Sequence, residues 1–208
     1  ECCFANPLEG CEKNASFMKD LKEWSSLTRH IYIWDYVVNF TQYIAPYPNL
    51  AVLAKNIRTF GEHGATIVLE QGQRESFGGE FGDMKAWVIA KLLWNPYQDT
   101  DKLVKAFIRD YYGAAAPYIQ RYYEMCQRTI TADTHIYQNK DCTTLLTDEF
   151  LTEARQLLDK ALQSCQDGRV EKSRVEDVRA QILYIKTTRK PVKSKLNGDT
   201  EEFRKYVE

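Results

Sequence analysis

Acidic side chains close two apolar segments of the sequence. Asp35 lies near the end of a β-branched and aromatic run at residues 30–38, and Glu70 ends a second run at residues 65–70. Both runs are typical of buried strands, in which a carboxylate costs free energy unless it is paired or used. Glycoside hydrolysis commonly uses two carboxyl groups, roughly 5–9.5 Å apart. Adjacent strands are about 4.8 Å apart and would place Asp35 and Glu70 within that range.

Structural roles compete with catalysis at these positions. In this alternative, one of the two acids pairs with an arginine or caps the following helix, and the candidate arginines are Arg29, Arg58 and Arg74. Glu80 is a third candidate catalytic residue, because it follows Gly78-Gly79 at a predicted helix start, where the helix dipole favours an anion. Ordinary capping of the first helical turn explains Glu80 equally well.

Aromatic and amide side chains surround the same strand ends. The predicted substrate-binding residues are Trp34, Tyr36, Asn39 and Gln71. The two aromatic rings would form a platform for a sugar ring, and packing in the core is the alternative. Trp87 and Trp94 recur at helical spacing, and we expect both to lie in the core.

The segments that carry these residues predict alternating strands and helices. We expect strands at residues 30–38 and 65–70, a further strand end at 1–4, and helices at 14–28, 49–63 and 80–94. Apolar strands that alternate with amphipathic helices indicate parallel βαβ units and an α/β fold. Two or three strands cannot close an eight-stranded barrel. Either the front of a barrel is missing from this chain, or the sheet is small and open.

The rest of the chain is predicted to be helical. We expect helices at 101–112 and 117–131, then an antiparallel pair at 148–166 and 170–188 that turns at Asp167-Gly168. The predicted organisation is residues 1–96 as βα units, 97–190 as a helical C-terminal region and 191–208 as a polar tail.

Composition and motifs argue against several functions. The formal charge of the 208 residues is −1, which gives no electrostatic footprint for nucleic acid. No apolar run reaches the ~18–20 residues of a membrane span. The chain begins at Glu1 rather than Met, so its localisation cannot be read from a leader. No P-loop, GxSxG motif or strand-following GxGxxG motif occurs, and we expect no cofactor.

The cysteine and histidine residues do not follow a metal-binding spacing. The six cysteines are Cys2, Cys3, Cys11, Cys126, Cys142 and Cys165. They include no CxxC pair, and the three histidines are scattered, so we expect no metal site. Cys126 could bridge Cys142 or Cys165 in an oxidising compartment, and buried free thiols are the alternative.

Several motifs resemble one protein family. They are residues 32–36 with Asn39-Phe40 and residues 46–50, then Glu70-Gln71-Gly72, then Gly79-Glu80-Phe81 running into residues 90–96. Tyr111-Tyr112-Gly113, residues 116–119 and the opening Cys3-Phe4 with Pro7-Leu8 and Cys11 fit the same pattern. Together they resemble the domain of unknown function 4838, found in bacterial, often Bacteroides-type, multidomain proteins. The resemblance covers about residues 1–125.

This resemblance implies the C-terminal part of a (β/α)8 TIM-like barrel, distantly similar to α-glucuronidases and hexosaminidases, followed by a mainly α-helical C-terminal region. It also implies a secreted or periplasmic protein with a carbohydrate substrate. The first half of the barrel is expected before this region in the same natural protein. The resemblance carries over positions rather than roles, and these positions are Trp34, Asp35, Tyr36, Asn39, Glu70, Gln71 and Glu80.

Three functions are compatible with these features. The first is a glycoside hydrolase acting on oligosaccharides or polysaccharides, with Asp35, Glu70 or Glu80 as acid, base or nucleophile. The second is a non-catalytic glycan-binding protein with a degenerate barrel. The third is a helical interaction module whose short strands complete a partner's sheet, and it predicts no concave site at the strand ends. Two carboxyl groups that face one cleft within ~10 Å favour the enzyme.

Overall fold

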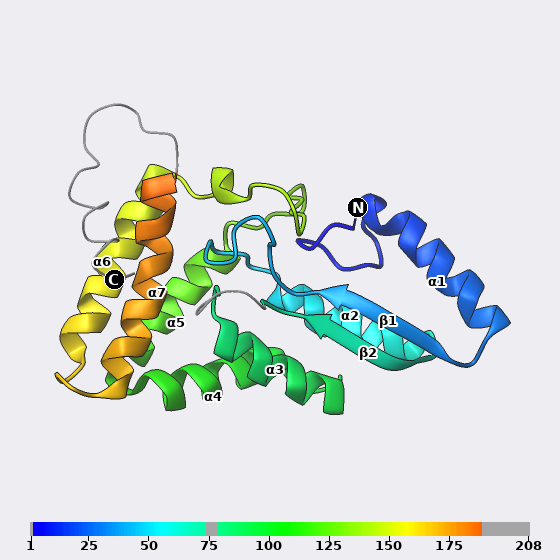
Figure 1. Ribbon diagram of the computed structural model, residues 1–208, viewed down its shortest axis with the longest axis horizontal. Helices are drawn as coiled ribbons and strands as arrows, with labels where there is room; N and C mark the ends of the chain where they lie inside the picture. Colours follow the sequence, from blue (N-terminus) through cyan, green and yellow to red (C-terminus); the bar gives the residue numbers. More distant parts are fainter. Residues whose placement is uncertain (1, 74–78, 189–208) are drawn as a thin grey trace.

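Two parallel strands and the helix between them form the centre of the N-terminal part (Figure 1). The computed structural model describes residues 2–73 and 79–188. β1 (Ile31–Tyr36) pairs in parallel with β2 (Ala65–Gln71), and α2 (Leu50–Glu62) connects them. The register sets Asp35 opposite Glu70. The mixed α/β fold expected from the sequence is confirmed in this coarse form, with a two-stranded sheet in the described part of the chain.

The remaining elements of the described part of the chain are helical. In chain order they are η1 (Glu12–Asn14), α1 (Ala15–Leu27), α3 (Gly82–Trp94), α4 (Thr100–Tyr112), η2 (Gly113–Ala115), α5 (Ala116–Gln127), η3 (Thr143–Leu145), α6 (Asp148–Ser164) and α7 (Val170–Thr188). The seven α-helices within residues 2–73 and 79–188 match the seven that the hydrophobic periodicity predicts there, with ends that differ by a few residues. The turn between α6 and α7 contains Gly168 at φ 75°, a conformation that glycine adopts without strain.

The strand end expected at residues 1–4 is wrong for the described residues 2–4, which form no strand. The buried Asn14 side chain holds the Cys3 backbone instead. The Cys3 N–H donates to Asn14 Oδ1 at 2.6 Å, and Asn14 Nδ2 donates to the Cys3 carbonyl at 3.1 Å. The Phe4 N–H donates to the Ile136 carbonyl at 2.9 Å. These backbone groups are therefore engaged in loop contacts rather than in a third strand.

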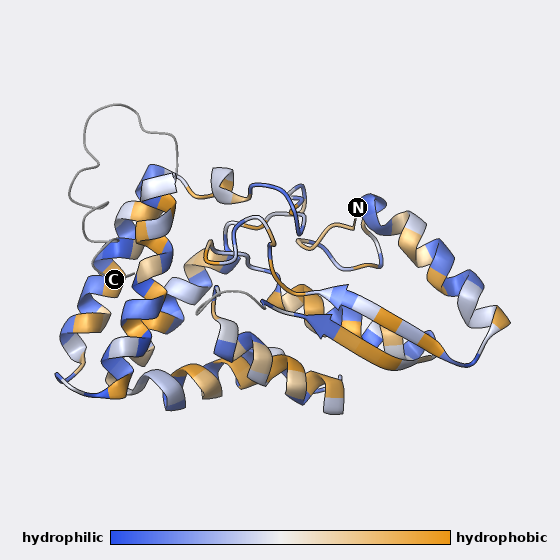
Figure 2. Cartoon of the chain, in the orientation of Figure 1, coloured by the Kyte–Doolittle hydropathy of each residue, from blue (hydrophilic) through white to orange (hydrophobic). Residues whose placement is uncertain are grey.

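The two faces of the sheet differ in their covering. Ile33 and Val68 pack with Phe60 of α2 in a buried apolar cluster. On the opposite face, which we call the open face, Tyr32 and Trp34 are 51% and 57% exposed. Figure 2 shows both strands apolar along much of their length and hydrophilic at their arrowheads. The polar strand ends that the sequence singled out therefore lie together at one edge of the sheet.

One continuous core joins the N-terminal part to the C-terminal helices. Figure 1 shows α5, α6 and α7 side by side at one end of the molecule. The core includes buried side chains from the N-terminal loop, α2 and each helix from α3 to α7, namely Phe4, Leu53, Val88, Ile108, Ile119, Leu158 and Ile182. The predicted regions 1–96 and 97–190 thus share one core, and the predicted tail at 191–208 lies outside the described residues.

The two tryptophans expected in the core lie on the surface of α3. Trp94 is 91% exposed and Trp87 is 36% exposed. The buried face of this helix contains Met84, Val88 and Leu92 instead. Trp87 and Trp94, which are seven residues apart, both lie outside that face. Within the described residues, no helix has both the length and the apolar character to span a membrane.

Candidate functional site

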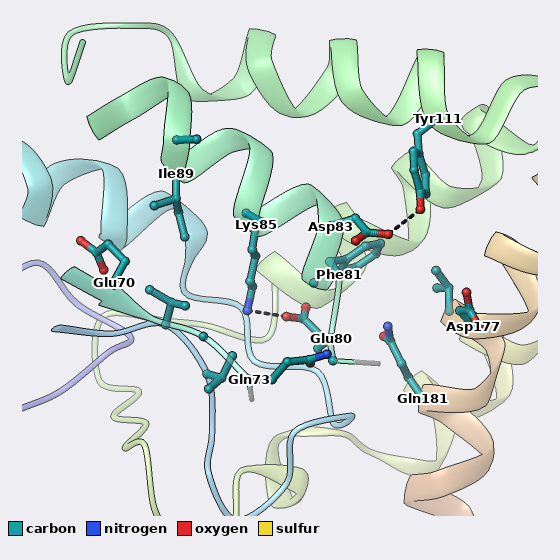
Figure 3. A pocket seen from close by; sticks show the side chains of 18 of the residues that line it. Glu70, Gln73, Glu80, Phe81, Asp83, Lys85, Ile89, Tyr111, Asp177 and Gln181 are labelled. Carbon is teal, nitrogen blue, oxygen red and sulfur yellow. Dashed lines mark hydrogen bonds and ion pairs between the residues drawn. The ribbon is translucent and has the colours of Figure 1, made fainter. Parts of the chain in front are cut away.

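A cavity of about 510 Å³ lies where β2 ends. It is bounded by the carboxyl end of β2, the start of α3 and one face of α7 (Figure 3). Its volume falls within the range of about 300–1,000 Å³ that is typical of ligand pockets. The charged and hydroxyl side chains that line it include Glu70, Glu80, Asp83, Lys85, Tyr111 and Arg174. Two of the three predicted catalytic residues therefore line one cavity, and Asp35 does not.

Asp35 and Glu70 form a pair of buried carboxyl groups next to this cavity. The Tyr36 N–H donates to Asp35 Oδ1 at 2.8 Å. Asp35 Oδ2 and both Glu70 oxygens are buried without a hydrogen-bond partner among the described residues. Burial raises the pKa of Asp35 to about 6, and burial together with the Asp35 charge raises the pKa of Glu70 to about 9. The two carboxyl groups therefore hold a proton at higher pH than isolated carboxyl groups do, with the larger upward shift of the pKa on Glu70.

Glu80 and Lys85 form a buried ion pair in the cavity wall, shown in Figure 3. Glu80 Oε2 lies 2.5 Å from Lys85 Nζ, and the side chains are 3% and 5% exposed. Lys85 Nζ also donates to the Tyr47 carbonyl at 2.9 Å, and the Glu80 N–H donates to the Tyr43 carbonyl at 2.9 Å. Burial raises the pKa of Glu80, and the positive charge of Lys85 opposes that rise. The pair fastens the loop between β1 and α2 to the start of α3.

The opposite wall of the cavity joins α3, α4 and α7. The Tyr111 hydroxyl donates to Asp83 Oδ2 at 2.5 Å, as the second dashed line in Figure 3 shows. Arg174 donates from Nη1 to the Tyr111 carbonyl at 2.7 Å, and its Cζ lies 3.7 Å from the centroid of the Tyr111 ring. Burial and the Asp83 carboxylate raise the pKa of Tyr111 to about 12, so the hydroxyl remains a donor. The polar groups of this wall are thus linked to one another across three helices.

Phe81 adopts a left-handed backbone conformation at the start of α3. Its φ and ψ are 48° and 38°, and its side chain is 3% exposed. The ring packs 5.9 Å from the rings of both Tyr122 and Tyr123, measured between centroids. This conformation costs an L-residue about 1–2 kcal/mol, and such strain is concentrated at functional sites. Phe81 lies between Glu80 and Asp83 in the chain, so it fixes the backbone that connects two acids of the cavity.

The open face of the sheet carries three of the four predicted substrate-binding residues. Trp34 Nε1 donates to Gln71 Oε1 at 2.7 Å, which holds the exposed indole over the end of β2. Tyr36 lies opposite Gln71 in the register, and its ring makes an edge contact with Phe40 at 5.4 Å. The indole is therefore an accessible aromatic surface, whereas the Tyr36 ring is half-buried.

Asn39, the fourth predicted substrate-binding residue, is buried and fully engaged within the protein. Its Nδ2 donates to the Lys140 carbonyl at 2.7 Å, and its Oδ1 accepts from the backbone N–H groups of Thr41 and Gln42 at 2.9 and 3.2 Å. The side chain is 1% exposed. Asn39 holds the loop after β1 against the segment before η3, and it offers no free group to a ligand.

A family model matches more than half of the chain. Residues 1–124 match the Domain of unknown function (DUF4838). The chain belongs to the DUF4838 family. The family resemblance predicted from the sequence motifs is therefore confirmed, and the matched region includes Glu70, Glu80 and Tyr111 of the cavity. No curated protein and no solved structure matches this DUF4838 chain.

This DUF4838 protein also places residues in its cavity that sequence patterns did not single out. Arg174 and Gln181 lie seven residues apart, about two helical turns, on the face of α7 that borders the cavity. Gln181 Oε1 accepts a hydrogen bond from the buried Tyr122 hydroxyl at 3.2 Å. No local sequence pattern predicts that α7 borders the same cavity as the end of β2. Among these helical residues of the cavity, Tyr111 could have been found from the sequence, because it lies within a family motif.

A second group of reactive side chains lies apart from the cavity. Cys3, Cys11 and His135 come from two loops that are distant in sequence, and their ligand atoms all lie within 4.8 Å of one another. Among the residues that the structure describes, these three side chains are the group of at least three His, Cys, Asp or Glu residues that could hold a metal ion. None of its members lines the cavity. All six cysteines are free thiols.

Proposed function

We propose that this protein is glycoside hydrolase-like and acts on oligosaccharide or polysaccharide glycans by carboxylate acid/base chemistry. One observation carries the proposal. Glu70 lines the cavity at the end of β2, and its carboxyl group is buried, free of hydrogen bonds within the described residues and shifted to a pKa of about 9. A carboxylic acid that keeps its proton at neutral pH is what protonation of a glycosidic oxygen requires.

In the proposed reaction Glu70 is the general acid. It donates its proton to the bridging oxygen as the bond between that oxygen and the anomeric carbon breaks. Water supplies the hydroxyl group that the anomeric carbon gains, and a second carboxylate accepts the proton that this water loses. Glu80 is our candidate for the second carboxylate, because it lines the same cavity and Lys85 favours its ionised form. Asp35 acts through Glu70, since its charge keeps the proton on that residue.

We also propose that the sheet belongs to a (β/α)8 TIM-like barrel whose other strands precede this region in the natural protein. The open face of the sheet supports this idea, because Tyr32, Trp34 and Ile67 are at least half exposed there. Large apolar side chains on a strand are normally covered by neighbouring elements. A secreted or periplasmic setting belongs to the same proposal and rests on the family resemblance.

A second candidate function is glycan binding without turnover. The observation that favours it is the exposed indole of Trp34, which its hydrogen bond to Gln71 holds in place. A fixed, accessible aromatic face suits stacking on a sugar ring. The third hypothesis, a helical interaction module, predicts no concave site at the strand ends and is disfavoured by the cavity beside Glu70.

Hydrolysis by the natural protein tests the enzyme proposal. The substrates are a panel of glycans and aryl glycosides, and the variants are Glu70→Gln, Asp35→Asn and, as a matched control, Glu62→Gln at the exposed end of α2. We expect Glu70→Gln to lower kcat by about 10²–10⁴-fold, the usual contribution of a general acid. The loss should be much smaller for dinitrophenyl glycosides, whose leaving group departs without protonation.

The outcomes separate the candidate functions. Undiminished turnover in both Glu70→Gln and Asp35→Asn would remove this pair from the mechanism. An equal loss for all leaving groups would assign Glu70 a structural role. Glycan binding without any turnover in the unaltered protein would favour the binding function.

A further inference from the structure

Two thiols and an imidazole converge near the N-terminus of the described chain. His135 Nδ1 lies 3.3 Å from Cys3 Sγ and 4.0 Å from Cys11 Sγ, and all three atoms lie within 4.8 Å of one another. The same ring nitrogen thus faces both sulfurs. Cys3 and Cys11 are buried, whereas His135 is exposed. The cluster therefore joins two buried thiols to an exposed imidazole.

These separations match the requirements of a tetrahedral ion. Zinc binds thiolate sulfur at about 2.3 Å and imidazole nitrogen at about 2.0–2.1 Å. A tetrahedron with those bond lengths sets two sulfurs about 3.8 Å apart and places each sulfur about 3.6 Å from the nitrogen. The nitrogen-to-sulfur distances of 3.3 and 4.0 Å lie on either side of that value. Two thiolates and one imidazole are ligands that zinc prefers over harder cations.

We propose that Cys3, Cys11 and His135 bind one zinc ion, with water in the fourth position. Binding releases the two thiol protons, and His135 ligates through Nδ1 while Nε2 carries the proton. The site would tie the N-terminal loop to the segment between α5 and η3. It lies apart from the cavity, so it stands independently of the proposed hydrolase function.

Hydrogen bonds to Asn14 hold the backbone of both cysteines in place. Both the N–H and the carbonyl of Cys3 are bonded to the Asn14 side chain, at 2.6 and 3.1 Å. The Asn14 N–H donates to the Cys11 carbonyl at 2.9 Å, so one residue positions both cysteines. A site whose ligands are already oriented binds a metal with less loss of conformational entropy.

The segment that carries His135 is fastened on both sides of that residue. Asn6 Nδ2 donates to the Thr134 carbonyl at 2.8 Å, and the Phe4 N–H donates to the Ile136 carbonyl at 2.9 Å. The N-terminal loop therefore holds the residues immediately before and after His135. This arrangement brings a histidine to two cysteines that are more than 120 residues away in sequence.

Cys3 Sγ also receives hydrogen bonds suited to a thiolate. The Ala5 N–H lies 3.4 Å from this sulfur, and Asn6 Nδ2 lies 3.9 Å from it. Donors directed at a sulfur stabilise its negative charge, and such second-shell contacts tune metal-bound thiolates. A buried neutral thiol in an apolar core would need no such donors.

No spacing rule indicates this site, because its three ligands are far apart in the sequence. Cys3 and Cys11 are eight residues apart, and His135 follows 124 residues after Cys11. Zinc sites that can be read from sequence have close ligand pairs such as CxxC. Here the fold, rather than a local motif, supplies the convergence.

Zinc content measures the proposal directly. The natural protein, reduced and dialysed against zinc, is analysed by mass spectrometry for metal per chain beside the variants Cys11→Ser and His135→Gln. Matched controls are Cys165→Ser, at the partly buried end of α6, and His30→Gln, which is exposed. We expect both site variants to bind one fewer zinc ion per chain, or at least about tenfold more weakly, while both controls bind as the unaltered protein does.

A second readout distinguishes ligation from a general effect on folding. Cobalt added to the metal-free protein should give a thiolate-to-cobalt charge-transfer band that Cys11→Ser weakens. A chelator should lower the Tm of the unaltered protein and leave the Tm of Cys11→Ser unchanged. Equal zinc binding by site and control variants would overturn the proposal. A Cys3–Cys11 disulfide that persists in the isolated protein and prevents zinc binding would overturn it as well.

Discussion

Asp35 and Glu70 lie opposite one another at the carboxyl ends of the two strands. Both belong to the helix-covered face of the sheet rather than to the open face. The register pairs them directly, and Ile33 and Val68, two residues earlier on each strand, pack against Phe60 of α2. Two carboxyl groups therefore approach each other in a poorly solvated setting. Their mutual repulsion and burial leave one of them protonated at neutral pH.

This relationship predicts that Glu70 makes the fold less stable as the pH rises. The pKa of Glu70 is raised to about 9 in the folded protein, whereas an unfolded glutamate titrates near ~4.3. Between these values the folded state holds a proton that the unfolded state has lost. The free energy of unfolding should therefore fall with increasing pH, by up to about 1.4 kcal/mol per pH unit.

The variant Glu70→Gln should remove this dependence. We expect it to be more stable than the unaltered protein at pH 8 and about equally stable near pH 4, as measured by urea denaturation across that range. Asp35, with a pKa of about 6, keeps a slope of the same sign at lower pH in both proteins. The exposed substitution Glu62→Gln is the control, and an identical pH profile for all three proteins would contradict the prediction.

The fold could be predicted where the pattern of apolar residues is local. The strand around Ile33 and the helix ending at Glu62 follow from β-branched runs and helical spacing, and both were found within a few residues. The strand end at residues 1–4 failed because Asn14 holds the backbone of Cys3, a contact that no periodicity reveals. The prediction that Trp94 lies in the core was wrong, because helical spacing alone does not determine which face of a helix packs against other elements.

The site could be predicted only in part for the same reason. Glu70 was singled out because an acid that closes an apolar strand is costly unless used, and Glu80 because a helix start favours an anion; both line the cavity. Asn39 was grouped with the substrate-binding residues by its position after a strand, yet its amide is used entirely by the loops. Arg174 depends on how α7 packs against the N-terminal part, and that packing is a property of the whole chain.

The Glu80–Lys85 ion pair yields a prediction about buried charge. The variant Lys85→Met leaves the Glu80 carboxyl group buried without its cation, and this should lower the free energy of unfolding by about 3–5 kcal/mol at pH 7. The double variant Glu80→Gln/Lys85→Met should recover part of that loss. Chemical denaturation measures both. The control is Lys19→Met, which breaks the exposed Lys19–Glu23 pair and should change stability little. A loss no larger than the control's would contradict the prediction.

The left-handed backbone of Phe81 predicts that glycine is more stable than alanine at this position, the reverse of the usual order in a helix. Phe81→Ala removes the buried ring and keeps the strained φ of 48°, whereas Phe81→Gly removes both the ring and the strain. We expect Phe81→Gly to be about 1–2 kcal/mol more stable than Phe81→Ala, as judged by chemical denaturation. Phe60, 1% exposed in the interior of α2, is the matched control. At position 60, inside a helix, the glycine variant should be about 1 kcal/mol less stable than the alanine variant. The same order at both positions would refute the strain argument.

Trp34 and Trp94 offer a matched test of the open face. Both indoles are exposed, at 57% and 91%, but only Trp34 lies on the sheet beside Gln71. If the open face binds glycans, Trp34→Ala should weaken binding of an oligosaccharide at least about tenfold, or about 1.4 kcal/mol, in calorimetric titrations of the natural protein. Trp94→Ala should leave the Kd unchanged, and both variants should keep their free energy of unfolding within about 1 kcal/mol, because exposed side chains contribute little to the core. If glycan binding survives in Trp34→Ala and is lost in Glu70→Gln, the sugar occupies the cavity on the helix-covered side instead, and the aromatic face serves to pack against neighbouring strands.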